Sequence, residues 1–310
     1  MVNENLPLVS IVIPAYNYAD YLDEAIQSVL DQDYPNVELI VLDDGSTDHT
    51  REVLEKYTGR FYWETQENMG QADTLNKGWQ RSKGEILGRL SADDVLLPDA
   101  VSTSVRHFLA NPAAVLTYCG YYLIDPSSSV IRRVNAPEFD YKEMVRQLVC
   151  PPGPGAFFLR DAYEATGEWN ASLRQVLDLD YWLRLGLQGK FLRIPEALAC
   201  FRIHEESQTF APADEEKAEE WVRVVSNYYE TQPVPSDVQA AKDEALSNGH
   251  ILAARFHIRS KRYLLGLKRL YEGLSLYPRN LSIRTARIIA HGFLNHVRHR
   301  IMQRMVKESR

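Results

Sequence analysis

The sequence has 310 residues, of which 45% are hydrophobic and 25% charged, the composition of a soluble globular protein and not of a disordered one. Its apolar runs fall far short of the roughly 18 to 20 residues that cross a bilayer, and its first residues lack the features of a secretory signal. We therefore expect a cytoplasmic protein. Cys119, Cys150 and Cys200 are widely spaced, so we expect reduced core thiols and neither disulfides nor a zinc site.

The net charge of −7 hides an asymmetry along the chain. Residues 250–310 contain 14 lysines and arginines against two acids, a charge of +12, which leaves −19 for residues 1–249. An acidic body repels nucleic acid and no recognition motif for it is visible, so we expect no nucleic-acid partner. The basic segment needs an explanation of its own.

Strand and helix patterns alternate along the first hundred residues. The β-branched runs at 8–13 and 37–42 lack strict alternation, which is typical of parallel strands buried on both faces. A helical pattern after Asp20 joins them into a βαβ unit. The elements expected next are a strand at 60–64, a helix at 71–82, a strand at 85–90 and a helix after Pro98.

The pattern changes after the fourth strand. From Val115 it resembles a β-hairpin, so we expect the sheet to become mixed, and from Ala213 it is almost wholly helical, with breaks at 232–235 and Pro278. The sequence thus predicts an α/β domain over residues 1–211, whose mixed, mainly parallel sheet is flanked by helices. Residues 212–310 are expected to form a helical extension that ends in a basic helix.

Paired acids follow two of the predicted strands. Ligands of open α/β sheets bind outside the carboxyl ends of the strands, where Asp43 and Asp44 follow one strand and Asp93 and Asp94 another. Either pair alone is explained by a turn or a helix cap. Two pairs at one edge concentrate negative charge and indicate a cation or a donor-rich ligand. The sequence disfavours a dinucleotide site, because no glycine precedes Asp44 for a G-x-G-x-x-G loop.

Six motifs, in order, resemble the family-2 inverting glycosyltransferases of the GT-A fold. They are SIVIPAYN at 10–17, DDGSTD at 43–48, NMGQADTLNKG at 68–78, SADDVLLP at 91–98, LDLDYWLR at 177–184 and FRIHEESQT at 201–209. The resemblance implies a GT-A-like fold. It also implies transfer of a sugar from a nucleoside diphosphate sugar, UDP-sugar favoured, to a hydroxyl of a saccharide or lipid-linked acceptor, in cell-surface polysaccharide synthesis.

The resemblance also implies roles for single residues. The donor is assigned to Pro14, Tyr16, Asn17, Asp43, Asp44, Asp93 and Arg202. Within this set Tyr16 offers a flat π-face to a nucleobase, and Asp44 accepts from the imide N–H of uracil or thymine. Asp94 and His204 are assigned to a Mg²⁺ or Mn²⁺ ion, which takes one or two carboxylates and completes its shell with substrate phosphates. Ordinary packing is the alternative for Tyr16 and His204.

An inverting transfer needs a base that deprotonates the attacking acceptor hydroxyl, and the resemblance selects Asp178. Asp180 is the other candidate. Both precede a helical pattern whose buried side carries Trp182, Leu183 and Leu185. We expect Asp180 to be the N-cap of that helix.

The last predicted helix carries an apolar ladder at every fourth position, from Ile289 through Phe293, Val297 and Ile301 to Met305, bordered by arginines. Packing on the catalytic domain and docking at the inner face of an anionic membrane both explain it. Two functional rivals also stay open. A nucleotidyltransferase would need a glycine-rich basic loop after the first strand. The intact Asp44, Asp94 and Asp178 argue against an inactive homologue that only binds, but Ser91 and Leu75, which stand where many members have an acid and an arginine, keep that alternative open.

Overall fold

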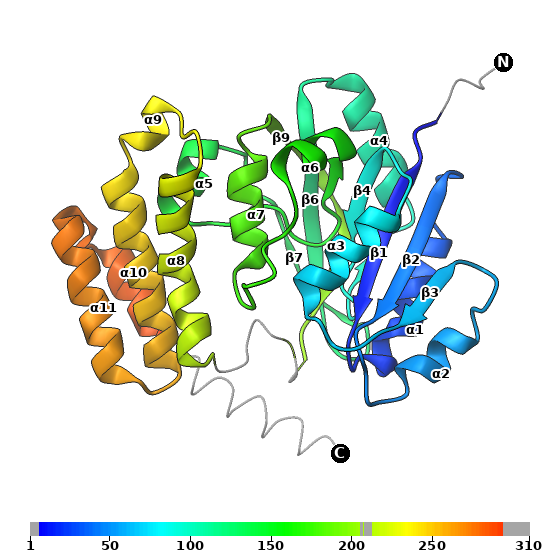
Figure 1. The fold of residues 1–310 in the computed structure, drawn as a ribbon, viewed down its shortest axis with the longest axis horizontal. Helices are drawn as coiled ribbons and strands as arrows, with labels where there is room; N and C mark the ends of the chain where they lie inside the picture. Colours follow the sequence, from blue (N-terminus) through cyan, green and yellow to red (C-terminus); the bar gives the residue numbers. More distant parts are fainter. Residues whose placement is uncertain (1–5, 205–206, 208–212, 294–310) are drawn as a thin grey trace. The chain divides into compact units, whose positions relative to one another are not determined.

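The computed structural model describes residues 6–204, 207 and 213–293. They form two compact units (Figure 1). The first unit contains Met1–Phe139, Cys150–Ser172 and Arg184–Ile203, and the second contains Asp140–Val149, Leu173–Leu183 and His204–Arg310. The domain boundary expected near Ala211 lies outside the described residues.

A nine-stranded mixed sheet forms the centre of the first unit, in the order β3-β2-β1-β4-β8-β6-β9-β5 with β7 paired to β6. Its strands are β1 (Val9–Ala15), β2 (Val37–Asp43), β3 (Tyr62–Thr65), β4 (Ile86–Arg89), β5 (Val95–Leu96), β6 (Ala114–Ile124), β7 (Val130–Val134), β8 (Phe157–Leu159) and β9 (Lys190–Arg202). Pairing is parallel from β3 to β4 and between β6 and β9. The predicted mixed sheet is confirmed, as is the antiparallel β6–β7 hairpin.

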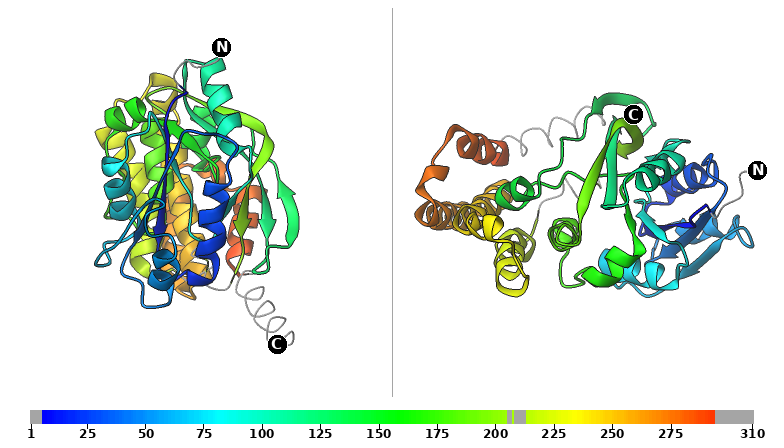
Figure 2. Two further views of the ribbon diagram at one scale, coloured as in Figure 1. Left: turned by 90° about the vertical axis from the view of Figure 1, so that its right-hand side faces the viewer. Right: turned by 90° about the horizontal axis from the view of Figure 1, so that it is seen from above.

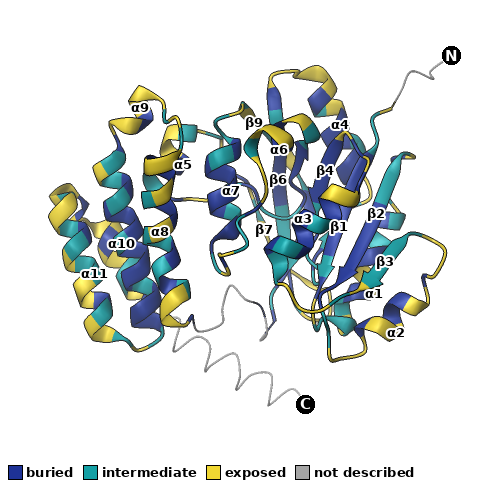
Figure 3. Cartoon of the chain, viewed as in Figure 1, coloured by how far each residue is buried: buried dark blue, intermediate teal, exposed yellow. Residues whose placement is uncertain are grey.

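Helices of this unit follow the strands. They are α1 (Ala19–Leu30), α2 (Thr50–Glu55), α3 (Gln71–Arg81), α4 (Ala100–Ala110) and α6 (Arg160–Thr166). The apolar stripe Leu22, Ile26 and Val29 of α1 joins the same core as β1, which is buried on both faces as a central parallel strand requires (Figure 3). Because β1, β2 and β4 run parallel, the loops after them leave the sheet at one edge.

The second unit is helical. Its helices are α5 (Tyr141–Gln147), the part of α7 (Leu177–Leu185) that ends at Leu183, α8 (Glu215–Thr231), α9 (Ser236–Gln239), α10 (Lys242–Arg259), α11 (Tyr263–Leu276) and the 3₁₀ turn η1 (Pro278–Asn280), and residues 283–293 are also helical. Both α8 and α11 pack on α10, as the views in Figure 2 agree. The breaks predicted at 232–235 and Pro278 are confirmed.

Two glycines let α11 approach α10 closely. A Cβ at Gly266 would lie 2.7 Å from Cγ1 of Ile258, and one at Gly273 would lie 2.8 Å from the carbonyl oxygen of Ser247. The large side chains of α11 therefore occupy its other face, where Leu264 and Tyr271 are exposed.

Two expectations about single residues are wrong. Cys150 is exposed, whereas Cys119 and Cys200 are buried free thiols as expected. Asp180 is not an N-cap, because α7 already begins at Leu177 and the Asp180 N–H donates to the carbonyl of Val176 at 3.1 Å.

The apolar ladder of the C-terminal segment is described only in part. Ile289 and Phe293 belong to the helix of residues 283–293, whereas Val297, Ile301 and Met305 lie outside the described residues. Within the part that the structure describes, no helix has the length and apolarity needed to cross a membrane.

Candidate functional site

The loops after β1 and β2 are tied to each other by Asn17. Its backbone N–H donates to Oγ of Ser46 at 3.0 Å, and its Oδ1 accepts from the N–H of Thr47 at 2.8 Å. Asn17 has a φ of 57°, a left-handed conformation that asparagine tolerates better than most residues. Two loops from distant parts of the sequence thus form one rim.

Tyr16 and Pro14 lie at the carboxyl end of β1. Pro14 is the last residue but one of the strand and is paired in register with Leu42 of β2. Tyr16 follows the strand, and 47% of its surface is exposed. An exposed aromatic residue beside a polar rim can stack on a flat ligand.

The Asp44 carboxylate is buried and already holds three hydrogen bonds. Oδ1 accepts from the N–H of Met69 at 2.8 Å and from Nε2 of Gln66 at 3.0 Å, and Oδ2 accepts from the N–H of Gly70 at 2.9 Å. These contacts fix the loop that enters α3 against the end of β2. Gln66 was not singled out by the sequence, because an amide between a strand and a helix gives no distinctive signal.

Asp43 keeps one buried acceptor unused. Its Oδ1 accepts from the N–H of Ser46 at 2.9 Å, whereas its Oδ2 is buried and has no hydrogen-bond partner among the residues described. A buried carboxylate oxygen without a donor costs free energy unless a ligand supplies one. Asp43 can therefore receive a hydroxyl or amide of a bound molecule.

Asp93 and Asp94 lie in the turn between β4 and β5. Asp94 is buried, and its Oδ1 accepts from the backbone N–H of Arg202 at 3.0 Å. Burial raises the pKa of the Asp94 carboxyl well above its usual range, and the neighbouring charge of Asp93 raises it further. A cation bound here would offset both effects.

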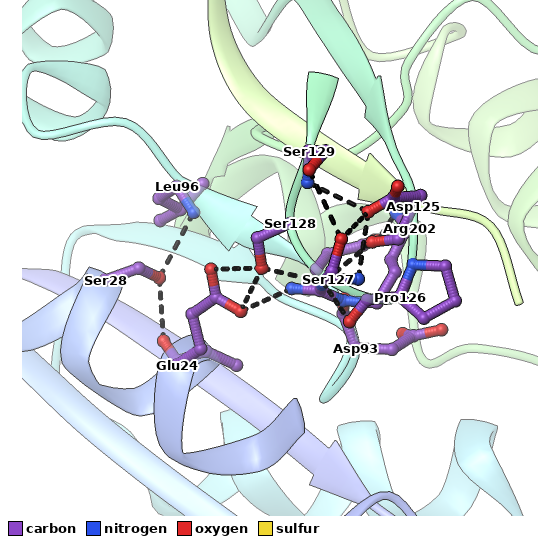
Figure 4. A network of polar contacts seen from close by, with 12 residues as sticks. Glu24, Ser28, Asp93, Leu96, Asp125, Pro126, Ser127, Ser128, Ser129 and Arg202 are labelled. Atoms are coloured by element: carbon purple, nitrogen blue, oxygen red, sulfur yellow. Dashed lines mark hydrogen bonds and ion pairs between the residues drawn. The ribbon is translucent and has the colours of Figure 1, made fainter. Parts of the chain in front are cut away.

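Arg202, at the end of β9, is fully buried, and its guanidinium contacts three separate segments (Figure 4). Nε donates to the carbonyl of Asp93 at 2.9 Å, Nη1 donates to the carbonyl of Asp125 at 3.1 Å and to Oγ of Ser128 at 2.9 Å, and Nη2 pairs with Oε2 of Glu24 at 2.6 Å. These contacts place Arg202 as the residue that holds the Asp93–Asp94 turn. Its direct contact with a diphosphate stays a prediction.

The two carboxylates in the turn between β4 and β5 suit a hard cation as ligands. Asp93 and Asp94 supply the one or two carboxylates that Mg²⁺ or Mn²⁺ takes from a protein when substrate phosphates complete its shell. No cluster of three or more His, Cys, Asp or Glu that could hold a metal occurs among the residues that the structure describes.

Asp178 and His204 both belong to the second unit. Asp178 lies in the first turn of α7, half-buried, and its Oδ1 accepts from the N–H of Leu179 at 2.8 Å. His204 is buried, and its backbone N–H donates to Oγ of Ser207 at 3.1 Å. Their roles as base and metal ligand stay predictions.

Glu220 of α8 holds the entrance to α7. Its buried carboxylate accepts from the backbone N–H groups of Arg174 at 2.8 Å, Gln175 at 2.7 Å and Val176 at 3.0 Å. This contact fixes the segment directly before Asp178. The sequence carried a signal for Glu220 that we missed: it lies four residues before Val224 in the apolar stripe of α8, where an acid is out of place.

Comparison with known proteins decides the family. The profile of Glycosyl transferase family 2 matches residues 10–166, half of the chain. The chain belongs to glycosyl transferase family 2. The matched range contains β1, the Asp43–Asp44 loop and the Asp93–Asp94 turn, whereas Asp178, Arg202 and His204 lie beyond it, and the predicted family membership is confirmed.

Several relatives of this family-2 chain have names or solved structures. The chondroitin synthase of Pasteurella multocida is 31% identical over 72% of this chain, which spans only 24% of that protein. Staphylococcus aureus TarS 1–349 with UDP-GlcNAc aligns with a TM-score of 0.66 at 16% identity, covering 94% of this chain and 89% of TarS. The mannosyltransferase PcManGT of Pyrobaculum calidifontis, with GDP-Man and Mn²⁺, gives 0.60 at 17% identity, covering 96% and 84%. These structures confirm the predicted GT-A-like fold.

Proposed function

We propose that this family-2 protein transfers a sugar, with inversion, from a nucleoside diphosphate sugar to a hydroxyl of a saccharide or lipid-linked acceptor. The observation that carries the proposal is the edge of the sheet where Tyr16 is exposed, Asp43 keeps an unpartnered buried oxygen and the Asp93–Asp94 turn concentrates negative charge. Relatives bind UDP-GlcNAc or GDP-Man, or are named for a polysaccharide product, which supports this donor class.

The proposed chemistry divides among four residues. Asp178 takes the proton of the acceptor hydroxyl as the oxygen attacks the anomeric carbon from the face opposite the leaving group, which inverts that centre. Asp94 and His204 would hold the metal ion, and Asp93 would contact the donor ribose or complete the metal's shell. When bound, the ion neutralises charge that develops on the departing nucleoside diphosphate. The protein's own contribution is to position the carboxylates and to orient donor and acceptor in line.

Thermal melts with candidate donors test the proposal directly. A ligand at 100 times its dissociation constant adds about 2.7 kcal/mol to folding stability, so the right nucleotide sugar raises the melting temperature. We expect UDP sugars with Mn²⁺ to raise it more than GDP or dTDP sugars do. Stabilisation without any turnover on saccharide acceptors would favour the inactive homologue, and no stabilisation by any of the donors would contradict the proposal.

Stacking on Tyr16 can be tested with two variants. Tyr16→Ala removes the ring and should weaken UDP binding by roughly 5- to 100-fold, because base–aromatic stacking contributes about 1 to 3 kcal/mol. Tyr16→Phe keeps the ring and should bind UDP nearly as well as the parent. Calorimetric titration measures both, and since the side chain is largely exposed we expect unchanged melting temperatures. Parent-like affinity in Tyr16→Ala would remove the residue from the donor site.

Metal dependence can be tested at Asp94. Asp94→Asn keeps the shape of the side chain and removes its charge, so it should weaken nucleoside diphosphate binding at least tenfold in Mn²⁺ and change it little in EDTA. Titration of UDP under both conditions gives the comparison. An equal loss in the presence and absence of metal would show that Asp94 acts through the turn and not as a ligand of the ion.

A further inference from the structure

A surface cavity of about 430 Å³ lies within the second unit, apart from the residues assigned to catalysis. It is lined by Arg255, Ile283, Arg284, Arg287, Ile288 and His291, from α10 and from the helix of residues 283–293. Three arginines and a histidine thus converge on one space, and none of the lining residues is acidic. Such a concentration of donors suits an anion that can accept several hydrogen bonds.

Arg255 is the most informative of these residues. Its Nε is buried and has no hydrogen-bond partner in the part of the chain that the structure describes. Burial lowers the pKa of Arg255, and no carboxylate counteracts that effect. Burial and the charge of Arg255 together lower the pKa of Arg259, one turn further along α10, to about 10. A buried guanidinium nitrogen such as Nε of Arg255 is unfavourable without an acceptor, and a ligand that carries negative charge would supply one.

Nearby acids do not neutralise the cavity. Glu143 and Glu244 act on Arg284 through their charge, but both are paired with Arg146. Among the described residues, Arg284 donates one hydrogen bond, from Nη1 to Oδ1 of Asn248 at 3.2 Å. Within this part of the chain, Arg284 therefore keeps other guanidinium donors for a bound molecule.

Apolar side chains are exposed next to these cations. Ile283 lines the cavity and is 74% exposed, and Leu281, two residues earlier, is 79% exposed. In the same unit Leu264 and Tyr271 project from the outer face of α11, since Gly266 and Gly273 occupy the face toward α10. Ile283 and Leu281 thus place exposed apolar surface beside the cations of the cavity.

We infer that the cavity binds the phosphate of an anionic lipid headgroup while the exposed apolar side chains enter the adjoining acyl region. Guanidinium groups match a phosphate in charge and geometry, and apolar residues beside basic ones are the arrangement of proteins that lie on anionic bilayers. A nucleic acid also carries phosphates, but it has no acyl region to receive the exposed side chains of Ile283 and Leu281 beside these cations. This surface is independent of the proposed transfer reaction.

Vesicle co-sedimentation tests the inference with the full chain. We expect binding to vesicles of equal parts phosphatidylcholine and phosphatidylglycerol at low salt, release as salt screens the charges, and no binding to phosphatidylcholine alone. Arg284→Gln/Arg287→Gln should weaken the partition about 30-fold, since each basic residue near the surface contributes about 1 kcal/mol. The control Lys217→Gln/Arg223→Gln removes the same charge from α8, which does not line the cavity, and should bind like the parent.

A second variant separates ligand binding from a structural role. Arg255→Met replaces a buried charge by an apolar chain, so it should be at least as stable to urea as the parent while losing vesicle binding. A lower stability would show that Arg255 is satisfied within the fold, and would overturn the inference. So would equal losses in the two double variants, tighter binding to an RNA oligonucleotide than to vesicles, or stabilisation by inorganic phosphate in a protein that does not bind vesicles.

Discussion

Asp178→Asn is expected to lower turnover by roughly 10²- to 10⁴-fold while donor affinity stays nearly unchanged, because a positioned base contributes to the chemical step and not to ground-state binding. Asparagine keeps the shape of the side chain and can still accept the hydrogen bond that Leu179 donates. Turnover is measured as nucleoside diphosphate released with a saccharide acceptor, and donor affinity by calorimetric titration.

Asp180→Asn is the matched control for that experiment. Asp180 lies in the same turn of α7, but its side chain is buried whereas that of Asp178 is half-buried. We expect it to keep most of the parent's turnover. A loss confined to Asp180→Asn would transfer the role of base to Asp180, and parent-like turnover in both variants would remove α7 from the chemistry.

Arg202→Met is expected to destabilise the protein by about 3 kcal/mol or more, because it leaves the groups around a buried guanidinium without their donor. The carbonyls of Asp93 and Asp125 and the carboxylate of Glu24 would each lose a hydrogen bond. Arg202→Lys keeps the charge but not the planar fork, so it should recover only part of the loss. Urea unfolding measures the free-energy difference.

Glu24→Gln separates the ion pair from the rest of this network. The Glu24 side chain is 45% exposed and glutamine still offers an oxygen to Nη2 of Arg202, so this change should cost less than Arg202→Met does. If Arg202→Met were no less stable than Glu24→Gln, the contacts to Asp93 and Asp125 would contribute little to the free energy of unfolding. Such a result would favour the diphosphate role that the resemblance implies for Arg202.

The parts of this fold that could be predicted from the sequence are those with local signals. The runs at 8–13 and 37–42 were identified as buried strands because parallel strands covered on both faces carry continuous β-branched side chains, and β1 and β2 confirm them. The acid pairs could be located because they follow strand ends directly. Family membership followed from motif order, which no single propensity would have given.

The parts that could not be predicted depend on partners far apart in the chain. Glu24 meets Arg202 across 178 residues, and on an exposed helix face it looks like any other acid. The prediction that Asp180 is the N-cap of α7 is wrong for the same reason. Glu220 of another helix accepts hydrogen bonds from the N–H groups before α7, so no cap from Asp180 is needed. Sequence reasoning looks for a cap nearby, and here it comes from about 40 residues away.

The hydrogen bonds of Asp44 bear on the nucleobase contact that the family resemblance implies for this residue. Its carboxylate is fixed by Gln66, Met69 and Gly70 before any donor arrives. A base that binds to it would therefore immobilise no side chain there, a saving of about 0.5 to 1.5 kcal/mol in conformational entropy. A fixed carboxylate would also discriminate between bases: we expect a base that presents an N–H to be bound and one that presents a carbonyl oxygen to be repelled by the negative charge.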